Sequence, residues 1–260
     1  MNRNLLICTA AVACLISAGC FENRQKPADV PTVTSLQALD ATNRPEVVRL
    51  ILRGQTGPIS DKDLADLPKL KMLDLSERNS KDIPQAVFGM KTLEHFYFVR
   101  NGLDKFPEAL QGLSALTYLN LDGNAIASLP DAAGALKSLK WLRLNDNKLE
   151  SLPAALGQLK DLRRFYARNN KFKAVPEVAK EWTMLEDITL DGNPISEVPQ
   201  WLTSLPKIRA ISLNNCPVKK LPDDLSGWKQ LDSLSLGACP IPPDEMKRIR
   251  AALPDVAMMF

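Results

Sequence analysis

The stretch that decides the fold is LTYLNLDGNAIASLP, residues 116–130, in which Asn124 stands within a run of regularly spaced leucines. The same arrangement returns 23 residues later as LKWLRLNDNKLESLP, around Asn147. Further asparagines occur at the same interval in both directions, at Asn101, Asn170 and Asn193. A fixed period of this length indicates a solenoid in which each repeat forms one coil.

The interval continues beyond the asparagines, to Cys216 and Cys239 on one side and to Arg78 and Gln55 on the other. A proline follows six residues after most of these positions: Pro84, Pro107, Pro130, Pro153, Pro176, Pro199 and Pro222. The combined pattern L-x-x-L-x-L-x-x-N-x-L-x-x-L-P resembles the leucine-rich repeat family from about residue 46 to about residue 241. Because Arg78 and Gln55 replace asparagine, we expect the first two coils to be irregular caps.

The resemblance implies an α/β fold, a curved solenoid of about nine coils. It places a parallel β-sheet on the concave face and short helical or irregular segments on the convex face. The residues themselves support a strand in each coil, since Leu119 and Leu121 alternate with Tyr118, Asn120 and Asp122. This two-residue period is typical of a strand with one buried face.

The repeated asparagine has a structural interpretation. It follows a strand where the chain turns inward, and a buried turn leaves backbone groups that must be paired. An asparagine side chain offers two donors and an acceptor, so it can join neighbouring coils. The predicted structural ladder consists of Asn101, Asn124, Asn147, Asn170, Asn193, Cys216 and Cys239. The two cysteines are weaker substitutes, and they are expected either as buried thiols or as a disulfide between adjacent coils.

The first 19 residues have the pattern of a signal peptide, with a short basic start and an apolar run that is too short to span a bilayer. The sequence LISAGC that ends at Cys20 resembles a bacterial lipoprotein box, which implies cleavage before Cys20 and lipid attachment to its sulfur. Plain secretion and a retained anchor are the alternatives. The sequence therefore predicts a membrane-anchored lipoprotein of the bacterial cell envelope, facing the periplasm or the cell surface.

Two segments flank the periodic region. Residues 20–44 contain few large apolar residues and two coil-breaking prolines, Pro27 and Pro31, so we expect a tether or an N-terminal cap. Residues 45–260 form the predicted leucine-rich repeat domain. Its last part, 243–260, breaks the interval and predicts a cap helix that begins at Pro243, followed by a strand from Val256.

The sequence contains few features that are typical of an enzyme active site. The chain has one histidine, no cluster with metal-ligand spacing and no glycine-rich phosphate loop. We therefore expect a protein that is not an enzyme and has neither a cofactor nor a metal. The 33 basic and 30 acidic residues nearly balance, so the charge gives no argument for a nucleic-acid partner.

The outward strand positions lie six, four and two residues before each ladder position. The candidate ligand-binding residues are those that occupy these positions in five coils, except Val99, together with the neighbouring Arg100: His95, Tyr97, Arg100, Tyr118, Asn120, Asp122, Trp141, Arg143, Asn145, Arg164, Tyr166, Arg168, Asp187, Thr189 and Asp191. All three tyrosines and the only histidine of the chain fall in this set. Tyrosine, tryptophan and arginine dominate the energetics of many interfaces.

We interpret this set as a surface for a protein or peptide ligand, because leucine-rich repeat proteins commonly bind partners on the concave face. A glycan ligand, a structural spacer without a specific ligand and a merely solvated sheet surface are the alternatives. Six other aromatic residues of the repeats occupy leucine positions and are expected in the core: Phe96, Phe98, Phe106, Phe172, Trp182 and Trp228. Trp201 does not fit that period and is expected to be exposed on the convex side.

Overall fold

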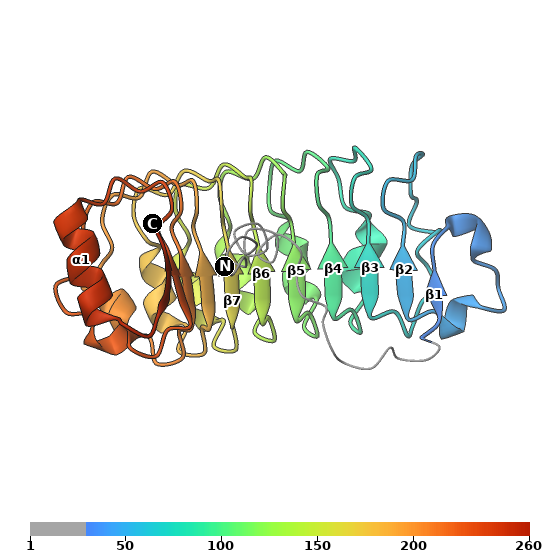
Figure 1. Ribbon diagram of the computed structural model, residues 1–260. Coiled ribbons are helices and arrows are strands. Elements are labelled where there is room, and N and C mark those ends of the chain that lie inside the picture. Colours follow the sequence, from blue (N-terminus) through green and yellow to red (C-terminus); the bar gives the residue numbers. More distant parts are fainter. Residues whose placement is uncertain (1–29) are drawn as a thin grey trace, which may run out of the picture. The chain divides into compact units, whose positions relative to one another are not determined.

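A computed structural model describes residues 30–260, and Figure 1 shows the strands of these residues side by side in chain order. The predicted signal peptide and Cys20 lie outside the described residues. In the part of the chain that the structure describes, no helix is long and apolar enough to cross a membrane.

One parallel sheet of eleven strands runs through the described residues, and each strand pairs with the next strand of the sequence. The strands are β1 (Thr32–Val33), β2 (Arg49–Ile51), β3 (Met72–Asp74), β4 (His95–Tyr97), β5 (Tyr118–Asn120), β6 (Trp141–Arg143), β7 (Arg164–Tyr166), β8 (Asp187–Thr189), β9 (Ala210–Ser212), β10 (Ser233–Ser235) and β11 (Ala257–Met259). The register from β3 to β10 follows the sequence interval, so that Leu119 faces Leu142, which faces Phe165. The predicted solenoid with a parallel sheet is therefore confirmed.

Short 3₁₀ helices occupy the opposite side of most coils. They are η1 (Leu36–Ala38), η2 (Arg44–Glu46), η3 (Gln85–Gly89), η4 (Glu108–Gly112), η5 (Asp131–Ala135), η6 (Ala154–Gln158), η7 (Glu177–Glu181), η8 (Gln200–Ser204) and η9 (Ser226–Trp228). From η3 to η8, each helix begins directly after one of the periodic prolines. Proline suits this place, because its fixed φ is compatible with the turn and its missing N–H is not required there.

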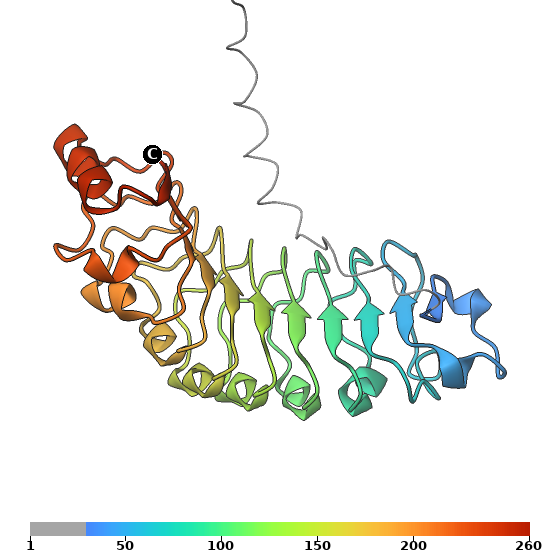
Figure 2. The ribbon, with the colours of Figure 1, turned by 60° about the horizontal axis from the view of Figure 1, so that its bottom comes forward.

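The coils of residues 31–260 curve, with the strands on the inner side and the 3₁₀ helices on the outer side (Figure 2). Paired strands lie only about 4.8 Å apart, whereas the helical segments are wider and spread the outer side. The geometry of the backbone thus produces a concave face that is made of strands.

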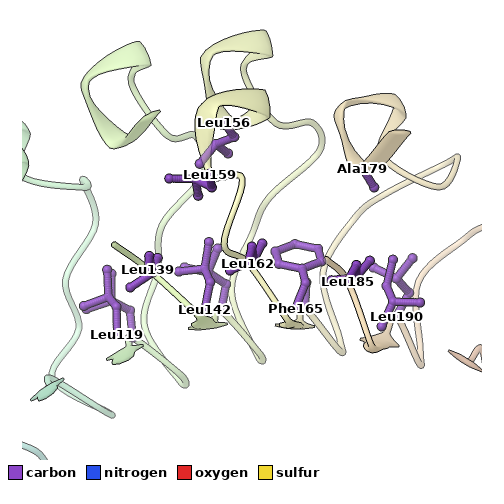
Figure 3. Packing of buried hydrophobic residues seen from close by; sticks show 14 of the residues in the cluster. Leu119, Leu139, Leu142, Leu156, Leu159, Leu162, Phe165, Ala179, Leu185 and Leu190 are labelled. Carbon is purple, nitrogen blue, oxygen red and sulfur yellow. The ribbon is translucent and has the colours of Figure 1, made fainter. Parts of the chain in front are cut away.

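Between the two sides lies a continuous apolar core. Figure 3 shows Leu119, Leu142 and Phe165 in a row, one from each of three successive strands. The six aromatic residues predicted for the core are 0–6% exposed, which confirms that prediction: Phe96, Phe98, Phe106, Phe172, Trp182 and Trp228. Trp201 instead is partly buried against the core, and Lys180 Nζ lies 5.7 Å from its ring centroid.

The chain turns inward after each strand through a residue in the left-handed region. This residue directly precedes the interval position, and it has a positive φ in nine successive coils: Gly54, Glu77, Arg100, Gly123, Asp146, Asn169, Gly192, Asn215 and Ala238. Only three of the nine are glycines, so most coils accept the cost of a side chain in this conformation. Arg100 is one of them, which puts its side chain at the rim of the concave face.

Both ends of the core are covered. At the first coil, β1 adds a strand to the sheet and Leu39 and Val47 are buried beside it. At the last coil, α1 (Pro243–Ala252) buries Ile249 and is followed by β11. Arg248 ties this helix to the preceding coil, because its guanidinium donates to the carbonyl oxygens of residues 221–223.

Candidate binding surface

The asparagines of the predicted ladder do join neighbouring coils. Asn147 is 8% exposed, and its Nδ2 donates to the carbonyl oxygens of Leu121 and Leu144 at 3.0 and 3.1 Å. Its Oδ1 accepts from the backbone N–H of Ile126 at 3.1 Å. The carbonyl that lies 26 residues before the ladder position accepts a hydrogen bond in every coil from Asn101 to Cys239: Asn101, Asn124, Asn147, Asn170, Asn193, Cys216 and Cys239.

The substituted ladder positions keep the donor role of asparagine. Cys216 Sγ donates to the Leu190 carbonyl at 3.4 Å, and Cys239 Sγ donates to the Leu213 carbonyl at 3.1 Å. Both thiols are free and buried, and burial raises the pKa of Cys216 to about 11. Arg78 reaches the equivalent Leu52 carbonyl at 2.9 Å, so a coil that was expected to be irregular continues the ladder.

A second intercoil network lies two residues before the ladder, and sequence reasoning missed it. Asp122 Oδ1 accepts from the backbone N–H of Asn145 at 2.7 Å, and Asn145 Oδ1 accepts from the N–H of Arg168 at 2.8 Å. Asp191 and Asn214 repeat the arrangement. A recurrence of Asp and Asn at this position was the available signal, because such side chains readily accept from nearby backbone N–H groups.

Three of the predicted ligand residues are buried near this second network instead of exposed to solvent. Asn145, Asn120 and Asp122 are only 6%, 8% and 9% exposed, although they had been expected on an outward, solvated surface. Asn120 Oδ1 accepts from the N–H of Asp122 at 2.9 Å. Asp122 and Asn145 therefore hold neighbouring coils together, Asn120 supports the turn of its own coil, and all three offer little surface to a ligand.

Above this layer the aromatic side chains of β4, β5 and β6 form a contiguous row. His95 meets Tyr118 edge-on with ring centroids 5.9 Å apart, and Tyr97 lies 4.9 Å from Tyr118. The ring of Tyr118 is in turn 5.5 Å from that of Trp141. All four side chains are half-buried by these lateral contacts. We call His95, Tyr97, Tyr118 and Trp141 the aromatic row.

Arginines continue the row towards β7. Arg164 places its guanidinium carbon 4.3 Å from the centroid of the Trp141 ring. Arg143 lies 5.4 Å from the Tyr166 ring and forms an ion pair with Asp122, with Nη2 and Oδ2 2.8 Å apart. This ion pair is largely withdrawn from solvent, since its side chains are 23% and 13% exposed.

Burial changes the acid–base properties of this face. Desolvation lowers the pKa of His95, so that its imidazole favours the neutral form near neutral pH. Desolvation also raises the pKa of Tyr97 and Tyr118. Asp187 has a raised pKa for the same reason, although the hydroxyl of Tyr166 opposes the shift by donating to its Oδ2 at 2.7 Å.

The remaining predicted residues lie at the edges of this face. Arg100 and Arg168 are exposed at the rim, where they pair with Glu77 and Asp146. Asp191 accepts from the Ser212 hydroxyl at 2.6 Å, and Thr189 is half-buried on β8. Within residues 30–260, no group of three or more histidine, cysteine, aspartate or glutamate side chains could hold a metal ion.

Comparison with known protein families identifies the family to which these repeats belong. The family described as "Leucine-rich repeat region" matches residues 107–193, and the family described as "Leucine rich repeat" matches residues 68–126. The chain is a leucine-rich repeat protein. A search of curated protein sequences finds no match to it.

Solved structures share the fold of this leucine-rich repeat protein. The internalin InlF of Listeria monocytogenes is 19% identical with a TM-score of 0.64, over 83% of this chain and 67% of that one. The Arabidopsis thaliana receptor kinase ectodomain GASSHO1/SCHENGEN3, in complex with CASPARIAN STRIP INTEGRITY FACTOR 2, is 24% identical with a TM-score of 0.66, over 84% of this chain. The Arabidopsis receptor kinase HAESA, in complex with the peptide hormone IDA and the co-receptor SERK1, is 27% identical with a TM-score of 0.65, over 74% of this chain. The leucine-rich repeat protein spans only 28% and 34% of the lengths of these two plant receptors.

Proposed function

We propose that this leucine-rich repeat protein is a non-catalytic recognition module that holds a protein or peptide ligand on its concave face. The observation that carries the proposal is the aromatic row with the adjoining Arg164. Residues of these types concentrate binding energy when a partner removes them from water. The outer strands β9 and β10 offer only Ala210, Ser212, Ser233 and Ser235 at the same positions, so the row is confined to the middle of the sheet.

Similar solved structures are consistent with this proposal. Two plant receptor ectodomains with the same fold were solved in complexes, one of them with a peptide hormone. Their ligands are properties of those proteins, and the present chain covers about a third or less of each. The likeness supports a peptide or protein as the class of ligand for this chain.

A glycan ligand is the alternative with some support, because aromatic rings can stack on sugars. The contacts of Trp141 weigh against it, since Arg164 lies over its ring and Tyr118 packs beside it. A sugar would have to displace one of these neighbours before it could stack on the indole. A spacer without any ligand would leave the confinement of the aromatic row unexplained.

The proposal is tested with Tyr118→Ala, Trp141→Ala and Arg164→Ala, which change one column of the sheet on adjacent strands. We expect each substitution to weaken capture of the partner from envelope extracts by about 2 kcal/mol or more. Ser233→Ala is the matched control, because Ser233 occupies the same column on β10 outside the aromatic row. The measurement is crosslinking capture with the wild-type chain as bait, followed by titration of the recovered partner.

Stability is measured in parallel, since the three side chains are half-buried against one another. Thermal unfolding should show at most a loss of about 1 kcal/mol per substitution. A folded triple variant that captures the same partner with unchanged affinity would exclude the concave face as the binding surface. An unchanged cellular phenotype after loss of the whole row would favour the spacer instead.

We further propose that the protein is anchored in the bacterial cell envelope through lipid on Cys20. The support is the sequence that ends in LISAGC after a short apolar run. Cys20→Ser should release the protein into the soluble fraction, because several acyl chains would be lost at once. A variant that still sediments with membranes in high salt would point to a retained helix or a tightly bound partner.

A further inference from the structure

We propose that the concave face binds a carboxylate of an acidic peptide on a row of hydrogen-bond donors formed by Tyr97, Trp141 and Arg164. This inference rests on the proposed function and adds the chemical class of the ligand. These three residues are chosen because their side-chain donors remain wholly or largely unpaired within the protein, whereas other polar groups of the face are already hydrogen-bonded.

The indole N–H of Trp141 is one such donor. Within residues 30–260 the buried Trp182 and Trp228 donate from Nε1 to the carbonyl oxygens of Leu156 and Leu202, at 2.8 and 3.1 Å. Trp141 Nε1 has no partner among these residues, although its ring is fixed between Tyr118 and Arg164. A half-buried indole whose N–H lacks a protein partner is prepared to donate to a ligand.

Arg164 is the second donor group. The other concave arginine of this region, Arg143, is neutralised by Asp122. The Arg164 guanidinium forms no ion pair within 4.0 Å in the described part of the chain, and the hydroxyl of Tyr166 is its one hydrogen-bond partner there. Asp187 lies opposite Arg164 on β8 and interacts with it electrostatically without a direct contact. A guanidinium carries five N–H donors, so most of its hydrogen-bonding capacity remains. Its contact with Trp141 restricts its motion and holds the guanidinium over the face of the indole ring that carries the first donor.

Tyr97 extends the row, because its hydroxyl has no hydrogen-bond partner among residues 30–260. The ring of Tyr118 lies between Tyr97 and Trp141 and provides an apolar floor. A ligand that lies across these strands therefore meets alternating donors and apolar surface. An extended peptide with an acidic side chain and an adjacent aromatic or aliphatic side chain matches that order.

Each carboxylate of β5 to β8 on the same face already accepts at least one hydrogen bond from the protein, which argues against a ligand that is rich in hydroxyl donors. Asp122 accepts from Arg143 and from the N–H of Asn145. Asp187 accepts from the hydroxyl of Tyr166, and Asp191 accepts from residues of the next coil. The unpaired polar groups are thus mainly donors, and a carboxylate is the ligand group that gains most from donors of this kind.

The test uses the full chain labelled with ¹⁵N and two tripeptide probes that match in shape, N-acetyl-Phe-Glu-Phe-amide and N-acetyl-Phe-Gln-Phe-amide. The reporter is the indole N–H resonance of Trp141, assigned by its loss in Trp141→Phe. We expect the Glu probe to shift this resonance saturably and to bind about tenfold more tightly than the Gln probe, because hydrogen bonds to a charged group are stronger.

Arg164→Gln should remove the preference for the Glu probe, whereas Arg209→Gln should keep it. Arg209 is an exposed arginine on the loop before β9 and serves as the matched control. Unchanged backbone amide spectra establish that both variants are folded. Equal affinity for the two probes, an unshifted Trp141 resonance, or an undiminished preference in Arg164→Gln would each overturn the inference.

These outcomes separate the inference from the proposed function. If a partner is captured through the aromatic row while the two probes bind equally, the recognition function stands and the carboxylate preference fails. If the Glu probe binds selectively while variants of the row capture the natural partner without loss, the donor row is real and the natural partner binds elsewhere.

Discussion

Truncation of Trp182 to alanine should reduce the free energy of unfolding by about 3–5 kcal/mol. Trp182 is fully buried, its ring lies 5.0 Å from that of Phe165, and its Nε1 donates to the Leu156 carbonyl at 2.8 Å. The substitution removes the packed ring and this hydrogen bond together, and the neighbouring coils cannot collapse freely because the sheet holds their spacing. Urea unfolding followed by far-ultraviolet circular dichroism measures the loss.

Trp201→Ala is the control for this prediction. Trp201 lies on η8, is only partly buried and has Lys180 near one face of its ring. Its truncation should cost less, about 1–2 kcal/mol, because its ring is only partly enclosed by the core and its indole N–H makes no hydrogen bond within residues 30–260. If both variants unfold at the same urea concentration, the assignment of Trp182 to a leucine position of the core is wrong.

Asn147→Ala should cost about 3 kcal/mol, although the substitution removes only a small polar group. The backbone N–H of Ile126 loses its acceptor in a fully buried place. The carbonyls of Leu121 and Leu144 each keep only one of the two asparagine donors that they share with the adjacent ladder residues. Because each coil of a solenoid is stabilised chiefly by its neighbours, the loss affects both sides of the substitution.

Two further variants make this prediction sharper. Ser128→Ala, at an exposed position of the preceding coil, should change stability by no more than about 0.5 kcal/mol. Asn147→Cys should fall between wild type and Asn147→Ala, because a thiol can donate to the carbonyl as Cys216 does but cannot replace the acceptor. Equal urea midpoints for Asn147→Ala and Ser128→Ala would contradict the structural role of the ladder.

The 23-residue interval in the sequence was sufficient to predict the fold. A period of 23 residues fixes which residues lie at equivalent positions, and the alternation of Leu119 and Leu121 with polar neighbours fixes which face is buried. The burial of Trp182 and Trp228 follows from the same rule, since they occupy leucine positions. These features depend on local periodicity, which a sequence displays directly.

The composition of the concave face was also predictable, but the accessibility of its members was not. Tyr118 and Asn145 both occupy outward strand positions by the period. Tyr118 lies in the aromatic row, whereas Asn145 is 6% exposed and accepts from the N–H of Arg168. The difference arises because the strands end between these positions, and the chain beyond Asn120 or Arg143 needs acceptors from the neighbouring coil.

Only the tertiary structure decided which polar groups of the face are available. Arg143 and Arg164 both occupy outward strand positions in the sequence pattern, yet Arg143 is neutralised by Asp122 while Arg164 stacks on Trp141 without an ion pair. The indole N–H of Trp182 donates to the Leu156 carbonyl, whereas that of Trp141 has no partner among residues 30–260. Such pairings depend on side-chain conformations across adjacent coils about 4.8 Å apart. The sequence by itself determined the coil, the sheet and the ladder, whereas contacts between side chains 21 to 23 residues apart determined which polar groups of the concave face remain unpaired.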